Sequence, residues 1–87
     1  MLFVIQWTIA PECRDAANAR FKETGGMPPA GVEMLGRWHF AAGGEGLLVC
    51  KADSGVALGK WMLDWSDLMR FRVSPVNDDA DVTEVLG

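Results

Sequence analysis

Stretches with the two-residue period of β-strands alternate along this chain with stretches that have the period of α-helices. Strand patterns cover residues 2–9, 32–40, 47–52 and 71–76. The first is almost continuously apolar, which favours a central position, whereas Pro75 favours an edge position for the last. One helix is predicted from Pro11 to about Thr24. A second is predicted from an i, i+3, i+4, i+7 stripe, formed by Leu58, Trp61, Met62, Trp65 and Leu68.

The order strand, helix, strand, strand, helix, strand is that of a ferredoxin-like domain. We therefore predict an α+β fold with a four-stranded antiparallel sheet, in the order 4-1-3-2, and two helices on one face. The 87 residues suit a single domain, which we place at residues 1–76, followed by a short acidic C-terminal tail at residues 77–87. In this tail, Val82, Val85 and Leu86 have the spacing of a short helical turn, capped by Asp78 or Asp79.

The alternation within the strands assigns side chains to the two faces of the sheet. We expect the bulky set to lie under the helices: Phe3, Ile5, Trp7, Trp38, Phe40 and Phe71. The opposite, open face is then expected to carry Val4, Gln6, Thr8, Leu35, Arg37, His39, Leu48, Cys50, Arg70 and Arg72. This mixture is too apolar to be left bare in water, so we predict a homodimer in which two such faces meet and enclose a cavity.

The composition excludes several classes of protein. A formal net charge of −4 argues against nucleic-acid binding, which needs a basic surface. No segment approaches the roughly 20 apolar residues of a membrane span, and the apolar start lacks the basic region of a signal peptide. With only two cysteines, Cys13 and Cys50, and no secretory signal, we expect free thiols and a cytoplasmic location.

His39, the only histidine, is suited to proton transfer near neutral pH, and the alternative is a structural role at the interface or the hairpin end. Cys50 is expected diagonally across the hairpin from His39, so a nucleophilic pair competes with a simple buried thiol. We assign neither residue a catalytic role. One histidine and two separated cysteines form no metal-ligand cluster, and we expect no cofactor.

Three arginines, Arg37, Arg70 and Arg72, are predicted on the open face, where guanidinium groups bind a carboxylate or phosphate or form ion pairs between subunits. Together with Gln6, His39 and Cys50 they make up the ligand site predicted from the sequence. Trp61 and Trp65 are one helical turn apart, which suits core packing better than an aromatic cage.

Several segments of the chain resemble one known family. They are residues 19–26, Pro28-Pro29, residues 35–39 and residues 65–68, followed by Phe71, Val73, Pro75 and Val76. In one register across nearly the whole chain, they are similar to the short proteins grouped as domain of unknown function 3303. The resemblance implies a ferredoxin-like domain of the dimeric α/β-barrel type, and it implies no particular reaction.

Two functional hypotheses follow from these observations. The first is a non-catalytic binding or structural module, which takes up a small organic anion between facing sheets. The alternative, by analogy with other dimeric α/β-barrel proteins, is a cofactor-independent enzyme such as a monooxygenase or isomerase that uses His39. A proton-transfer group in a closed pocket distinguishes the enzyme from the binding module.

Overall fold

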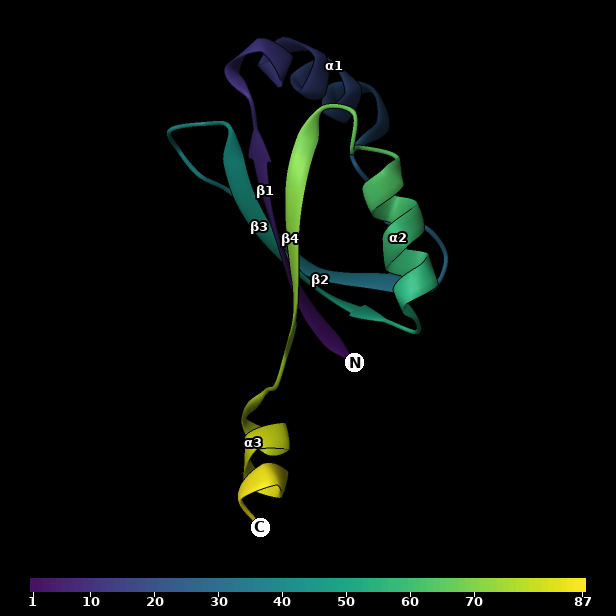
Figure 1. Cartoon of the computed structure of the whole chain (residues 1–87), viewed down its shortest axis with the longest axis vertical. Coiled ribbons are helices and arrows are strands. Elements are labelled where there is room, and N and C mark those ends of the chain that lie inside the picture. The colour runs from purple at the N-terminus through teal and green to yellow at the C-terminus, as the bar shows by residue number, and fades with distance from the viewer.

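The computed structural model describes residues 1–87 and has one antiparallel sheet in the order β2-β3-β1-β4 (Figure 1). The strands are β1 (Leu2–Ile9), β2 (Val32–His39), β3 (Glu45–Ala52) and β4 (Met69–Val76). Read from the other edge, this is the predicted order 4-1-3-2, and the α+β ferredoxin-like fold is confirmed. β1 is central and β4 lies at an edge, as their sequences indicated.

Local signals set the ends of the helices. Pro11 opens a short 3-10 turn, η1 (Pro11–Cys13), which leads into α1 (Arg14–Thr24). Gly25 ends α1 with a φ of 72°, a left-handed conformation that glycine adopts without strain. The Ser54 side chain caps α2 (Gly55–Leu63) by accepting a hydrogen bond from the Ala57 N–H. The second helix is shorter than its apolar stripe predicts, since Trp65 lies in the turn that follows.

The core lies between one face of the sheet and the helices. Its buried residues are Ile5, Trp7, Leu48, Cys50 and Ala52 from the sheet, and Leu58 and Trp61 from α2. Phe3 and Phe71 pack against this core, so four of the six aromatic and aliphatic residues expected under the helices are there. Figure 1 shows α1 at the end of the sheet where β4 begins, with α2 to one side of the strands.

A β-bulge in β2 reverses the expected faces of the residues that follow it. Met34 pairs with Cys50 but Gly36 pairs with Val49, so Leu35 is one extra residue in β2. Because side chains alternate with a period of two, one extra residue moves every later side chain of the strand to the other face. Arg37 and His39 therefore lie on the helix side of the sheet, opposite Leu48 and Gly46.

The sheet faces predicted from the sequence are wrong for six residues, four of them in or directly after β2 and two in β3. Trp38 and Phe40 are on the open face, 58% and 45% exposed, instead of under the helices. Arg37 and His39 moved inward because of the bulge, while Leu48 and Cys50 face inward because they pair with Ile5 and Phe3. The register confirms the open face for Gln6, Arg70 and Arg72, since Gln6 pairs with Arg72 and Thr8 with Arg70.

The tail forms a third helix, α3 (Asp79–Leu86), which lies beyond the end of β4 and apart from the body (Figure 1). Asp78 is its N-cap, and a reciprocal hydrogen bond with Asp81 completes a capping box. The helical turn predicted near Val82 is thus present. None of the helices has the length and apolar character needed to span a bilayer.

Trp7 reaches its buried position by lying across Gly46 of the neighbouring strand. A Cβ atom at residue 46 would lie 2.2 Å from the Trp7 ring and 2.6 Å from the Trp38 carbonyl oxygen. We expect Gly46→Ala to lower the free energy of unfolding by about 1–3 kcal/mol, the usual cost of overpacking. Urea denaturation monitored by tryptophan fluorescence measures this loss.

Gly59→Ala is the matched control, because residue 59 is in the interior of α2 with no atom within 4 Å of an added Cβ. There the same methyl group should stabilise the protein by roughly 0.5–1 kcal/mol through helix propensity. Equal effects of the two substitutions would contradict the contact between Trp7 and Gly46.

Candidate functional site

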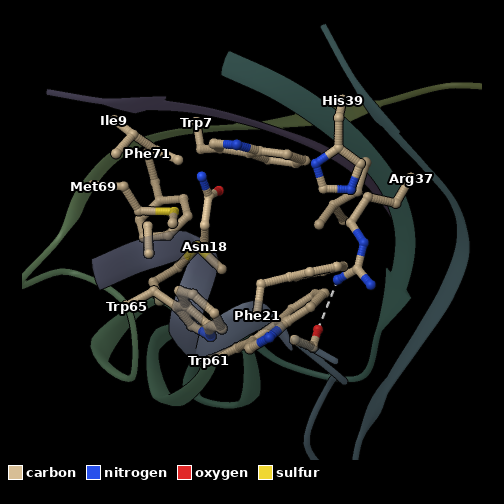
Figure 2. Close-up of a pocket in the computed structure, with 14 residues that line it drawn as sticks. Trp7, Ile9, Asn18, Phe21, Arg37, His39, Trp61, Trp65, Met69 and Phe71 are labelled. Carbon is tan, nitrogen blue, oxygen red and sulfur yellow. Dashed lines mark hydrogen bonds between the residues drawn. The ribbon is translucent and has the colours of Figure 1, made fainter. Parts of the chain in front are cut away.

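The helices and the sheet do not close completely on each other, and a cavity of about 230 Å³ remains between them (Figure 2). Aromatic rings form much of its wall, and every element of the α/β body except η1 contributes to it. The lining residues are Trp7, Ile9, Ala17, Asn18, Phe21, Gly26, Arg37, His39, Leu48, Trp61, Met62, Trp65, Met69 and Phe71. No carboxylate is among them. Such a cavity suits an apolar molecule better than a cation or a sugar.

Asn18 gives the mostly apolar cavity a hydrogen-bonding group in addition to Arg37 and His39. It belongs to α1, one residue after Ala17, the one buried residue of that helix. Figure 2 shows its amide pointing from the helix side toward Trp7 and the middle of the cavity. A carboxamide both donates and accepts hydrogen bonds, so it can orient a ligand that carries an oxygen or an N–H group.

His39 lies at one side of the cavity with its ring held by two aromatic neighbours. Its ring centroid is 5.4 Å from that of Trp7 and 5.3 Å from that of Phe21, both in edge-to-face geometry. The residue is nevertheless exposed. His39 therefore borders both the solvent and the cavity. This position suits a proton-transfer group, or a polar side chain at the entrance of the cavity.

Arg37 fastens the end of α1 to the sheet. Its Nη1 donates to the Gly26 carbonyl oxygen at 2.7 Å and its Nη2 donates to the Gly25 carbonyl oxygen at 2.9 Å. The guanidinium also lies over Phe21, 4.9 Å from the ring centroid. Burial lowers the pKa of Arg37 from its usual value. Its fork is occupied by backbone carbonyls, so it does not provide the free anion site expected from the sequence.

Arg20 makes a second attachment of α1, which the sequence analysis did not find. Its two terminal nitrogens donate to the two carboxylate oxygens of Asp67 at 2.8 and 2.7 Å, and Nη1 also reaches the Asp64 carbonyl oxygen at 2.8 Å. The guanidinium lies 5.4 Å from the Trp65 ring centroid. Arg20 and Asp67 are 47 residues apart, so no local pattern links them.

The structure divides the site predicted from the sequence into two groups. Arg37 and His39 border the cavity, whereas Gln6, Arg70 and Arg72 line a separate hollow of about 280 Å³ on the other side, with Thr8, Phe40 and Glu45. Cys50 belongs to neither group. It is fully buried opposite Met34, and burial raises the pKa of its thiol.

The expected pairing of His39 with Cys50 is wrong. His39 lies opposite Gly46, which is four residues from Cys50 along β3, so the two side chains do not meet across the hairpin. Cys50 is a buried apolar side chain of the core, in agreement with the alternative that the sequence left open.

Comparisons with known proteins identify the family and support the fold. The family described as Domain of unknown function (DUF3303) matches residues 1–87, the whole chain. A solved structure described as "Structure of Rv0793 from Mycobacterium tuberculosis" aligns with 90% of this chain and 97% of that chain, with 20% sequence identity and a TM-score of 0.53. No curated protein matches. At this identity, the likeness to the solved structure concerns the fold alone.

The contact between Arg20 and Asp67 predicts a pH-dependent loss of stability. The hydrogen bonds from Arg20 lower the pKa of Asp67 in the folded protein, so the pair stabilises the fold above the ordinary Asp pKa. That contribution disappears as the pH falls through the lowered value. Asp67→Asn should therefore reduce Tm by a few degrees at pH 7, and the difference from wild type should vanish in acid.

Glu23→Gln removes one carboxylate from the exposed surface of α1 and serves as the control, because Glu23 makes no side-chain hydrogen bond. Thermal melts of the three proteins between pH 2 and pH 7, the range in which aspartate titrates, test the contact. A Tm difference for Asp67→Asn that is the same at every pH would contradict it.

Proposed function

The chain belongs to the DUF3303 family, a domain of unknown function, and we propose that it binds a small, planar, largely apolar molecule in the cavity between its helices and its sheet. The observation that carries this proposal is the lining, in which five Trp and Phe rings surround a space whose polar side chains are Asn18, Arg37 and His39. Clefts that are mostly apolar with a few placed polar groups are typical small-molecule sites.

The size of the cavity limits the ligand. A dry cavity of about 150 Å³ holds benzene, and this one has about 230 Å³. It therefore accommodates a molecule with one or two fused rings. The absence of a carboxylate from the lining disfavours a cation, and the amide of Asn18 favours a ligand with a hydroxyl or carbonyl oxygen.

The four tryptophans offer a built-in test of this site. Trp7, Trp61 and Trp65 line the cavity, whereas Trp38 is on the open face. Titration with 2-naphthol, a two-ring molecule with one hydroxyl, should shift the indole N–H signals of the three cavity tryptophans in a ¹⁵N–¹H spectrum and leave Trp38 unmoved. Aromatic ring currents act over short distances, so the selectivity follows from the geometry.

A substitution at Asn18 and a second ligand without a hydroxyl test the role of the amide. Asn18→Leu keeps a side chain branched at Cγ but loses the amide, so it should weaken 2-naphthol binding by roughly two- to tenfold, the net value of one hydrogen bond. Naphthalene, which has no hydroxyl, should bind the variant at least as tightly as the wild type. Shifts confined to Trp38, or no shift of any tryptophan, would place the ligand site elsewhere.

A second candidate function is catalytic, and the position of His39 favours it. The imidazole borders the cavity, where it can accept a proton from a bound ligand, and the solvent, to which it can release that proton. His39→Gln tests this candidate. If the protein is a cofactor-independent monooxygenase or isomerase that uses His39, the variant loses turnover of its substrate. If the protein is a binding module, the variant retains its affinity for aromatic ligands and there is no turnover to lose.

We further propose that the open face is covered by a second copy of the chain. Trp38, Leu35 and Phe40 are 58%, 49% and 45% exposed on or beside this face. The Trp38 ring lies close to Gly36, where an added Cβ would be 2.4 Å from it, so the glycine leaves room for the ring on this face. An apolar surface of this kind is typical of an interface.

Trp38→Glu tests the homodimer. A carboxylate within a sheet-to-sheet contact loses its hydration without gaining a partner, so we expect the dimer to dissociate at micromolar protein concentration in sedimentation velocity. Val56→Glu, at a 68% exposed position of α2 on the helix side, should leave the dimer intact. A wild-type monomer at high micromolar concentration would contradict the proposal.

A further inference from the structure

The C-terminal helix α3 has no packing partner within its own chain. Every residue from 77 to 87 is exposed, including Val82, Val85 and Leu86, which lie on one side of the helix at 43%, 74% and 80% exposure. Figure 1 shows α3 standing clear of the sheet at the far end of β4. The radius of gyration is accordingly 14.1 Å, compared with roughly 12 Å for a compact chain of this length.

A helix of eight residues is not stable alone in water, because nucleation is costly and few hydrogen bonds follow it. The capping box of Asp78 and Asp81 nevertheless specifies where this helix begins. A well-capped helix with an uncovered apolar side indicates a surface that is completed by another molecule.

The charges of α3 and of the open face are complementary. The helix and its cap carry Asp78, Asp79, Asp81 and Glu84 and no basic residue. At the opposite end of β4, Arg70 and Arg72 are exposed and make no ion pair or side-chain hydrogen bond within the chain. They line the hollow that also contains the exposed ring of Phe40.

From this juxtaposition we propose that α3 is a dimerisation arm, which docks on the Arg70 and Arg72 end of the open face of a second copy. The apolar side of α3 covers Phe40 and its neighbours, and the acidic side chains pair with the two guanidinium groups. The inference rests on the sheet-to-sheet homodimer proposed above and specifies which parts of the two copies meet.

The position of α3 favours a contact between chains. Five residues lie between Arg72 and Asp78, and an extended segment that joins the two spans roughly 20 Å, so α3 begins well away from the arginines of its own chain. A two-fold axis that lies between the facing sheets, perpendicular to the strands, reverses strand direction. It brings the α3 end of each copy to the Arg70 end of the other.

A second hollow is consistent with this arrangement. A space of about 400 Å³ separates Asp81, Glu84 and Val85 of α3 from Met1, Leu2 and Val76 of the sheet. The arm therefore does not close onto its own sheet.

A charge-exchange experiment tests the arm directly. The first variant, Arg70→Glu/Arg72→Glu, places acidic groups opposite the partner's acidic arm. The second, Asp79→Lys/Glu84→Lys, places a basic arm opposite the arginines and leaves the capping box of Asp78 and Asp81 intact. In sedimentation equilibrium each variant alone should show a dimer Kd raised about tenfold or more, since two like-charge contacts form per symmetric dimer.

An equimolar mixture of the two variants should restore the association to within about threefold of the wild-type Kd, because both contacts of the mixed dimer are then between opposite charges. Only a contact between chains gives this rescue. Lys22→Glu/Lys60→Glu makes the same change in net charge as Arg70→Glu/Arg72→Glu, at exposed positions away from the open face, and should leave Kd unchanged.

The failures of the two proposals are distinguishable. If both charge variants dimerise like the wild type while Trp38→Glu dissociates the dimer, the arm contact is wrong and the sheet-to-sheet dimer stands. If the variants are weakened but the mixture is not rescued, the arm does not contact these arginines. If the wild type is monomeric, both proposals are wrong.

Discussion

One extra residue in β2 determines what each face of this sheet presents. Leu35 has no counterpart on β3, and the strand resumes its pairing with Gly36 opposite Val49. Without this bulge, Trp38 would point toward the helices and fill the space in which the cavity lies. With it, Arg37 and His39 point inward and Trp38 points outward, so the cavity and the apolar open face have the same origin.

The inward side chains of β2 act together with α1 to keep the cavity open. α1 has a single buried residue, Ala17, so the apolar core does not hold it tightly. Arg37 holds its C-terminal end by binding the Gly25 and Gly26 carbonyls, and Arg20 holds its side by binding Asp67. A helix fixed by polar attachments rather than by close packing leaves room beneath it, and the rings of Trp7, Phe21 and Phe71 line that room.

Much of the fold follows from the sequence because its signals are local. The changes of period and the edge-favouring Pro75 each act within a few residues, and the structure has both features. The faces predicted for the side chains of β2 beyond Met34 were wrong, because strict alternation assumes that the strand contains no inserted residue. A glycine inside a strand is a known sign of a bulge, and Gly36 was the available signal. The pair of Arg20 with Asp67 depends on packing between distant segments and has no such sign.

Native mass spectrometry of the protein purified from its own host tests the central claim, that the cavity is a binding site for a small apolar molecule. The account predicts one retained molecule per chain, with a mass appropriate to one or two rings, which is released when the chain is unfolded in acid. Protein that is ligand-free as isolated, and that takes up no aromatic compound from a mixture of one- and two-ring molecules, would contradict it.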